Sequence, residues 1–256
     1  MKINSPQFNL MYKACIKASK TLIRDFGEIE KLQVSEKGPG DFVTASDKRI
    51  EKIIIGELEK TGYSFLSEEA GEIQGKEREK RWIIDPIDGT ASFVRGVPLY
   101  SSLLAMVDEH GPAIGIIHLP ALGESLVAGR GLGAYSGEEK ATVSSIKSIT
   151  ESCISSSSFE QPWWPEEALL NITSSGAKIR TWGDGYGYFL VGTGRIEAMI
   201  DPSLHIYDVA AMLTIIPECG GSISTWSGET ELADKKGWVA TNGLIHQEVL
   251  STLSSL

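Results

Sequence analysis

An apolar segment that runs directly into two closely spaced aspartates is the feature that most restricts the fold of this chain. Residues 82–84 (Trp-Ile-Ile) are typical of a buried strand, and residues 85–90 (Asp-Pro-Ile-Asp-Gly-Thr) follow at once. The proline forces a turn that lets Asp85 and Asp88 converge, and Gly89 lets the backbone approach a ligand closely. The segment predicts a strand that ends at an oxygen-rich site for cations and an anion, although an Asp-rich capping turn without metal fits it equally well.

Two further segments place acidic residues where a strand ends or a helix begins. Glu68 and Glu69 follow a predicted strand over 63–66, and only one of them is expected to face a site, because neighbouring side chains of an extended chain point in opposite directions. Asp208 opens a predicted apolar helix over 207–219, which Pro217 is expected to kink near its end. Taken alone, Asp208 is more typical of a helix cap than of a ligand.

The remaining pattern indicates two halves, residues 1–142 and 143–256, that form one α/β sandwich. A polar boundary over 137–150 separates them, and the polar residues 71–81 are expected to form an exposed loop. The first half is predicted to contain helices over 7–30 and from 46, a Gly-Pro loop over 38–41, and antiparallel strands over 102–107, 113–118, 124–128 and 133–136. The second half is predicted to contain strands near 152–157, 196–200, 222–226 and 238–241, and helices from 165, over 185–193, over 207–219 and from 244.

Composition and charge exclude several classes of protein. Hydrophobic residues make up 41% of the 256 residues, yet no apolar run approaches the roughly 20 residues of a membrane helix. The three scattered cysteines argue against a disulfide framework or a zinc–thiolate site, and the N-terminus has no signal pattern, so we expect a cytoplasmic protein. A net charge of −10 without a basic run disfavours nucleic acid and anionic membranes as partners and suits the binding of divalent cations.

Together with residues 41–47 (Asp-Phe-Val-Thr-Ala-Ser-Asp) and 240–243 (Ala-Thr-Asn-Gly), these segments resemble the inositol monophosphatase family of metal-dependent, lithium-sensitive phosphatases. The resemblance covers nearly the whole chain. It implies a layered αβαβα sandwich of the sugar-phosphatase type, Mg²⁺-dependent hydrolysis of a small phosphomonoester by an activated water, and a homodimer.

The resemblance also implies a role for each residue of the site. Two or three Mg²⁺ ions are expected, held by Glu68, Asp85, the backbone carbonyl of Ile87, Asp88 and Asp208, with Asp85 bridging two of them. The attacking water would be oriented by Thr90, itself placed by Glu68 and Asp47. The substrate would be contacted by Asp88, Gly89, Thr90, Arg180, Asp184 and Asp201.

The leaving group is predicted from residues 180–188 (Arg-Thr-Trp-Gly-Asp-Gly-Tyr-Gly-Tyr), which resemble the histidinol-phosphate phosphatase branch. Asp184 and Asp201 would suit the ammonium and imidazole groups of L-histidinol phosphate, and Arg180 would contact the phosphate or position Asp184. Residues 24–27 and 37–39 look more like bacterial general inositol phosphatases, so an inositol-1-monophosphatase of broad specificity stays open.

Other interpretations also stay open at this point. A non-catalytic or dual-role regulatory partner would keep the fold, and a bisphosphatase would need more cationic side chains than Arg180 and Arg195. His205 reads best as a solvent-facing loop residue, and burial in the core is the safer prediction for Trp163 and Trp164.

Overall fold

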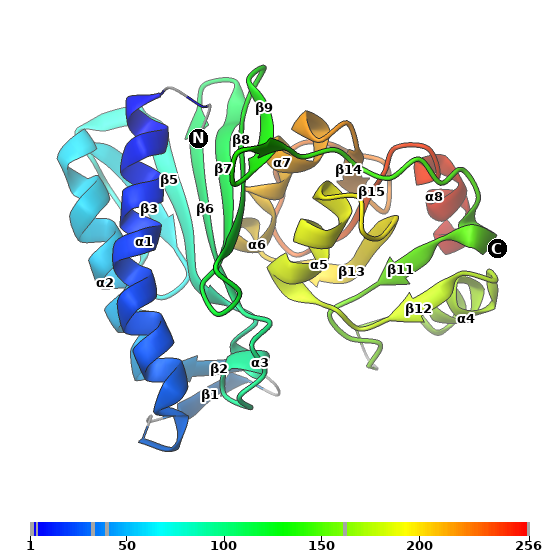
Figure 1. The fold of residues 1–256 in the computed structure, drawn as a ribbon, viewed down its shortest axis with the longest axis horizontal. Helices are drawn as coiled ribbons and strands as arrows, with labels where there is room; N and C mark the ends of the chain where they lie inside the picture. The colour runs from blue at the N-terminus through cyan, green and yellow to red at the C-terminus, as the bar shows by residue number, and fades with distance from the viewer. Residues whose placement is uncertain (1–2, 4, 32–33, 39–40, 161–162, 255–256) are drawn as a thin grey trace.

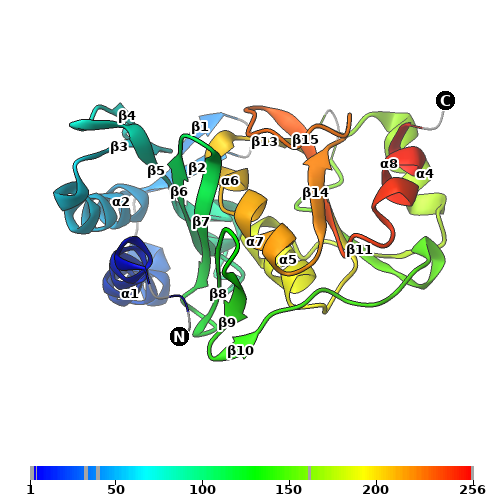
Figure 2. The same cartoon turned by 90° about the horizontal axis from the view of Figure 1, so that it is seen from above.

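The computed structural model describes residues 3, 5–31, 34–38, 41–160 and 163–254, which form five alternating layers of helices and sheets (Figures 1 and 2). This arrangement confirms the predicted αβαβα sandwich. The helical layers consist of α1 (Pro6–Gly27) with α2 (Ala45–Leu58), then α5 (Asp184–Gly192), α6 (Ile206–Val209) and α7 (Met212–Glu218), and finally α4 (Glu166–Ser174) with α8 (His246–Ser254).

The first sheet has the strand order β10-β9-β8-β7-β6-β5-β3-β4. Its neighbours pair antiparallel except β3 and β5, which run parallel. Its strands are β3 (Tyr63–Ser67), β4 (Gly71–Ile73), β5 (Glu77–Asp88), β6 (Ser101–Asp108), β7 (Gly111–Leu119), β8 (Glu124–Gly129), β9 (Gly133–Ser136) and β10 (Glu139–Lys140). Because β3 and β5 are parallel, their carboxyl ends meet at one edge of the sheet.

The second sheet, of order β12-β11-β13-β15-β14, mixes parallel and antiparallel pairs. Its strands are β11 (Cys153–Ser155), β12 (Lys178–Arg180), β13 (Ala198–Leu204), β14 (Ser222–Thr225) and β15 (Lys236–Thr241). A separate hairpin joins β1 (Val34–Gly38) to β2 (Asp41–Thr44), and the two central residues of the loop predicted there lie outside the described residues. The short helix α3 (Thr90–Phe93) follows β5.

Burial of one helical stripe explains why α1 lies on the first sheet. Ser5 caps the helix by accepting a hydrogen bond from the Phe8 N–H, and the buried residues then recur at three- and four-residue spacing. That stripe comprises Phe8, Met11, Cys15, Ala18 and Leu22. The middle helices α5 and α7 pack between the two sheets, so residues of both halves of the chain share one core.

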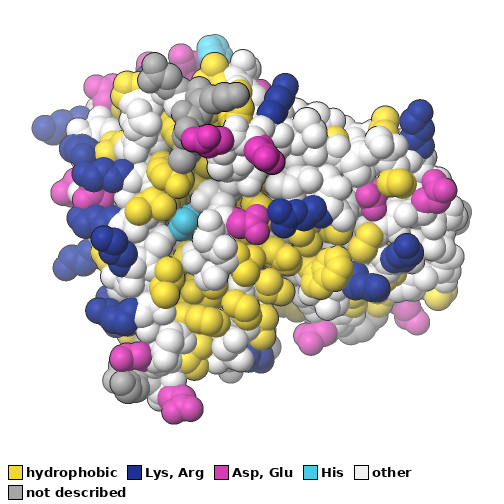
Figure 3. Space-filling model, viewed as in Figure 1, with side chains coloured by type: hydrophobic (Ala, Val, Ile, Leu, Met, Phe, Trp, Pro, Cys, Tyr) yellow, Lys and Arg dark blue, Asp and Glu magenta, His cyan; other side chains and the backbone are white. Residues whose placement is uncertain are grey.

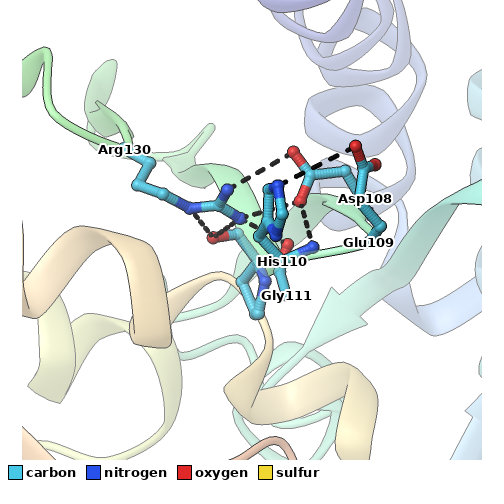
Figure 4. A network of polar contacts seen from close by, with 6 residues as sticks. Asp108, Glu109, His110, Gly111 and Arg130 are labelled. Carbon is cyan, nitrogen blue, oxygen red and sulfur yellow. Dashed lines mark hydrogen bonds and ion pairs between the residues drawn. The ribbon is translucent and has the colours of Figure 1, made fainter.

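A polar network fixes the predicted turn between β6 and β7 (Figure 4). The Arg130 guanidinium pairs with Asp108 at 3.0 Å and donates to the carbonyls of Gly111 and Pro112 at 2.6 and 2.9 Å. One side chain from the end of β8 therefore satisfies acceptors at the turn of the neighbouring hairpin.

Two predicted elements differ from those observed. Within the polar residues 71–81, residues 71–73 form β4 and residues 77–81 form the exposed first part of β5, so that only 74–76 connect them as a loop. Strands whose side chains are exposed lack the apolar pattern that identifies a strand. The predicted helix over 207–219 is divided into α6 and α7 by a turn at residues 210–211, well before Pro217.

Lys and Arg side chains form a row over the α1 and α2 layer (Figure 3). Within the described residues, none of the helices is both long and apolar enough to cross a membrane.

Candidate active site

A cavity of about 370 Å³ lies where the ends of β3 and β5 meet α3, α5, β13 and α6. Most of the acidic residues singled out from the sequence line it. Its acidic lining residues are Glu68, Asp85, Asp88, Asp184, Asp201 and Asp208. The remaining predicted residues that line it are Ile87, Gly89 and Thr90.

An irregularity in β5 brings Asp85 and Asp88 to the same cavity. Asp85 pairs with Leu103 of β6 and Asp88 pairs with Ser101, so three steps along β5 oppose two along β6. Such a bulge turns a side chain that would otherwise point to the opposite face of the sheet. The Ser102 hydroxyl donates to the Pro86 carbonyl at 2.7 Å within this bulge. The two aspartates therefore converge through a bulge in a continuing strand.

The carboxylate of Asp88 is anchored by groups that lie far from it in the sequence. The Gly185 N–H, in the first turn of α5, donates to Asp88 Oδ2 at 2.7 Å, and the Ser101 hydroxyl donates to the same oxygen. A Cβ at position 185 would lie 2.3 Å from Ser101 Oγ and 2.8 Å from Asp88 Oδ2. A side chain at this position would displace these atoms, so the glycine allows α5 to lie against the end of β5.

Asp184 adopts an uncommon backbone conformation, with a φ of +56° at the first position of α5. Its N–H donates to Ser157 Oγ at 2.9 Å, which holds the residue in place despite the strain of a left-handed conformation. The Asp184 carboxylate lies so close to Gly89 that a Cβ there would come within 2.9 Å of Asp184 Oδ2.

Glu68 and Glu69 lie in a turn after β3, and of the two only Glu68 lines the cavity, in agreement with the expectation that one of them faces the site. Carboxylate oxygens of Asp47, Glu68 and Glu69 lie within 4.8 Å of one another. Glu69 does not line the cavity, although its carboxylate lies close to that of Glu68. Thr90 donates to the Ile87 carbonyl at 2.8 Å.

Asp208 is the third residue of α6 and accepts a hydrogen bond from the N–H of His205, which caps that helix, at 2.7 Å. It therefore acts as a helix-terminal carboxylate and also lines the cavity, so the two interpretations of this residue do not exclude each other. His205 lines the cavity too, with its ring stacked on Tyr207 at a centroid distance of 5.0 Å.

Asp201 and Arg180, both predicted to contact the substrate, differ in their placement. Asp201 lines the cavity, but its oxygens accept hydrogen bonds from the Ser157 N–H and the Tyr188 hydroxyl, each at 2.9 Å. Arg180 lies on β12, where its guanidinium donates to the Ile179 carbonyl at 2.8 Å, and it does not line the cavity. The structure thus does not bring Arg180 to the carboxylates.

The buried carboxylates raise one another's pKa values. Burial, followed by the charges of Glu68 and Asp88, raises the pKa of Asp85 well above its ordinary range. Burial and the charge of Asp88 do the same to the pKa values of Asp184 and Asp208. Burial raises the pKa of Asp88 itself to about 6, although hydrogen bonds from Ser101 and Gly185 oppose that rise. The chain therefore holds negative charge here at a cost in free energy.

The residues of this cavity fit divalent cations. No Lys or Arg is found among the described residues that line it, so no side chain there offsets the six carboxyl groups. Asp85 is 3% exposed, and its Oδ1 atom is buried without a hydrogen-bond partner in the part of the chain that the structure describes. A buried acceptor normally has a partner, and a cation would supply one. The donors are oxygens, which suit Mg²⁺ better than zinc.

Sequence reasoning missed several residues that shape the site. Trp164 is buried as predicted, but Trp163 is 57% exposed and lines the cavity. Ser101, Ser157 and Tyr188 act by hydrogen bonds to aspartates that lie 13 to 44 residues away, and no local pattern reveals such a partner. For Trp163 a signal existed, because two adjacent tryptophans seldom both point into the core.

Comparison with known proteins places this chain and its fold in a family. Residues 4–256 match the model of the inositol monophosphatase family. An inositol-1-monophosphatase of Mesorhizobium japonicum is 33% identical over 97% of this chain and 96% of its own. A histidinol-phosphatase of Chlorobaculum parvum is 32% identical over 98% of both chains. The crystal structure of the extragenic suppressor protein SuhB of Bartonella henselae superposes with a TM-score of 0.89 at 31% identity, covering 98% of this chain and 99% of that one.

The chain belongs to the inositol monophosphatase family. It is a phosphoric monoester hydrolase of that class, as the sequence predicted.

Proposed function

We propose that this chain is a Mg²⁺-dependent phosphatase that uses the carboxylate cavity to hydrolyse a small phosphomonoester. One observation carries the proposal: six carboxyl groups, three of them buried and three half-buried, share a cavity without a described Lys or Arg, and Asp85 Oδ1 has no hydrogen-bond partner among the described residues. Carboxylates alone would repel a phosphate, so cations must lie between them. The presence of all these carboxyl groups in one cavity favours a catalytic role over a purely regulatory one.

The proposed ligands are the residues that the family resemblance implies. Glu68, Asp85 and the Ile87 carbonyl would hold one Mg²⁺, and Asp85, Asp88 and Asp208 a second. When bound, the cations supply Lewis-acid stabilisation of the phosphate and of the departing oxygen, and they make water a better nucleophile. Glu68 and Thr90 would orient the attacking water, with the Thr90 hydroxyl fixed by its hydrogen bond to Ile87.

The backbone conformation of Gly89, between β5 and α3, supports a phosphate-binding role for this residue. Gly89 has a φ of +78° and no Cβ, so its backbone can lie close to a ligand in the cavity. A side chain there would contact Asp184 and the Leu99 carbonyl instead.

L-Histidinol phosphate is the substrate that we propose. The leaving group would meet Asp184 and an aromatic wall formed by Trp163, His205 and Tyr207, which suits an ammonium and an imidazole ring. A second phosphate would find no Lys or Arg among the described lining residues, which disfavours bisphosphates. The likeness to a histidinol-phosphatase supports this choice, and the comparable likeness to an inositol-1-monophosphatase makes myo-inositol 1-phosphate the alternative.

Phosphate release from these two esters in Mg²⁺ tests the proposal. We expect kcat/KM to favour L-histidinol phosphate by about a hundredfold, which is about 2.7 kcal/mol of transition-state discrimination. A preference for the inositol ester would identify the alternative while keeping the metal site. Hydrolysis of neither ester, with full Mg²⁺ binding, would favour the regulatory role.

A further inference from the structure

One oxygen of the Glu51 side chain accepts three hydrogen bonds from the turn that follows β3. The donors are the Ser67 hydroxyl, the Glu69 N–H at 3.1 Å and the Ala70 N–H at 3.0 Å. Glu51 is 6% exposed, so water competes little for these bonds. A buried carboxylate that binds two consecutive backbone N–H groups fixes the path of the chain through them.

That turn carries Glu68, which lines the cavity. The Glu68 N–H donates to the Ile84 carbonyl at 3.2 Å, directly before Asp85 in β5. The turn is therefore attached on one side to β5 and on the other to α2, through Glu51. These two attachments set where the Glu68 carboxylate lies relative to Asp85.

The helix α2 approaches this turn with two acidic residues of one face. Asp47 lies four residues before Glu51, which places both side chains on the same side of the helix. The Asp47 carboxylate lies within 4.8 Å of those of Glu68 and Glu69. Like charges this close repel, so a turn held only by its own backbone would move Glu68 and Glu69 apart. The hydrogen bonds to Glu51 oppose that movement.

We propose that Glu51, which does not line the cavity, is a positioning residue that sets the affinity of the carboxylate site for Mg²⁺. It does so by holding the turn at residues 67–70 in the conformation that binds the cation, so that little ordering is needed when the ion arrives. The inference rests on the proposed function, because it concerns the same metal site. Glu51 itself contacts neither the ion nor the substrate.

Calorimetric titration of the full-length chain with Mg²⁺ tests this role in three variants. Glu51→Ala removes the acceptor and should raise the Kd for Mg²⁺ by about 10- to 100-fold, as losses of groups that orient metal ligands do. Glu51→Gln keeps an oxygen that accepts both N–H groups, and its Kd should stay within about threefold of the wild type. Glu57→Ala is the matched control, since it removes a glutamate of the same helix that pairs with Lys13 and Lys17 on α1.

The kinetic constants supply a second measurement. At saturating Mg²⁺, kcat of Glu51→Ala should lie within about threefold of the wild type, because the ligands themselves are intact. Should Glu51→Ala not fold, Ser67→Ala removes one donor to the same carboxylate and should raise the Kd about threefold.

Four results would overturn the inference. A Kd of Glu51→Ala within about twofold of the wild type would show that the turn needs no such support, and so would an unchanged Kd in Ser67→Ala. An equal loss of affinity in Glu51→Gln and Glu51→Ala would mean that the charge of Glu51, and not its hydrogen bonds, attracts the ion. A wild-type chain that binds no Mg²⁺ would instead refute the proposed function together with the inference.

Discussion

Asp184 and Asp201 line the same cavity, but their carboxylates have different surroundings. The Asp201 oxygens accept from the Ser157 N–H and the Tyr188 hydroxyl, and the side chain is 1% exposed. Asp184 is less buried and borders Gly89, where we propose that the phosphate binds. We therefore expect Asp184 to contact a cationic leaving group, and Asp201 to hold Ser157 and Tyr188 in place.

Replacement of Asp184 by Asn should affect a cationic substrate more than a neutral one. We expect kcat/KM for L-histidinol phosphate to fall at least about tenfold, because a hydrogen bond between two charged groups is replaced by a weaker one. The loss for myo-inositol 1-phosphate should be smaller than about threefold. Steady-state kinetics on both esters measure this, with Asp108→Asn, outside the cavity, as the control. Equal losses on both esters would contradict the assignment.

Trp163 lines the cavity, so the effect of its removal on kcat/KM should also depend on the substrate. Trp163→Ala should lower kcat/KM for the imidazole-bearing ester by about 5- to 10-fold, which corresponds to one aromatic contact, and Trp163→Phe should recover most of it. Leu170→Ala, at another exposed apolar position outside the cavity, is the control. Unchanged kinetics in Trp163→Ala would remove this residue from the leaving-group site.

The contact between α7 and β7 is a very close approach of two elements in the shared core. A Cβ at Gly115 of β7 would lie 2.4 Å from the Ala211 carbonyl and 3.1 Å from the Ile215 side chain. Backbone atoms cannot retreat as a flexible side chain can. The absence of a side chain at position 115 therefore sets how near the middle helices lie to the first sheet.

Gly115→Ala should destabilise the chain by about 1–3 kcal/mol, the usual cost of an overpacked core, or more if α7 cannot shift. Gly56→Ala is the opposite case, because a methyl group at this position in α2 would meet no described atom within 4 Å apart from its own chain neighbours and helix backbone. It should stabilise the chain by about 0.4–1 kcal/mol through the lower entropy of the unfolded state. Urea unfolding measures both changes. Equal stability of Gly115→Ala and the wild type would contradict the packing described.

The sequence predicts elements well wherever one face is buried. The strands β6 to β9 and the helix α1 carry regular apolar periods, and each lies within a few residues of its predicted position. The exposed strand β4 carries no such period, and β12 has only three residues. The turn that divides α6 from α7 follows from tertiary contacts, which a helical pattern in the sequence does not contain.

The same limit applies to the site. Aspartates that end a strand or begin a helix can be found in the sequence, and the structure gathers Asp85, Asp88 and Asp208 into one cavity. The bulge that turns Asp88, and the role of Glu51 at a turn that begins 16 residues further on, arise only when distant segments meet. Residues that are near in sequence can also be separated in the structure. Arg180 is only four positions from Asp184, yet it does not line the cavity.

At the scale of the whole molecule, the five layers bring the carboxyl ends of β3 and β5 to the middle helices (Figure 2). An acidic cluster, partly buried, lines the cavity at that place. The cluster opposes folding when its carboxyl groups are ionised, since burial raises the pKa of each of Asp85, Asp184 and Asp208. The folded chain thus binds more protons than the unfolded chain above about pH 4.

Stability without metal should therefore fall as the pH rises. The contribution of these groups to stability is fully present below about pH 4, where unfolded aspartates are protonated too. It is lost as the pH rises through the raised folded pKa values, of which that of Asp88 is about 6. Bound Mg²⁺ needs the ionised groups, so the rise in Tm caused by Mg²⁺ should be larger at about pH 8 than at about pH 5. Thermal unfolding at both pH values measures this, and an equal rise at both would contradict it.

Phosphate release with and without Mg²⁺ is the most direct test of the proposed metal-dependent mechanism. We predict that the metal-free chain is inactive, that Mg²⁺ restores hydrolysis, that EDTA abolishes it, and that Asp85→Asn lowers kcat by at least about a hundredfold at saturating Mg²⁺. Hydrolysis that continues in EDTA, or an Asp85→Asn variant as active as the wild type, would contradict the assignment of this carboxylate cavity as a cation site for phosphate ester hydrolysis.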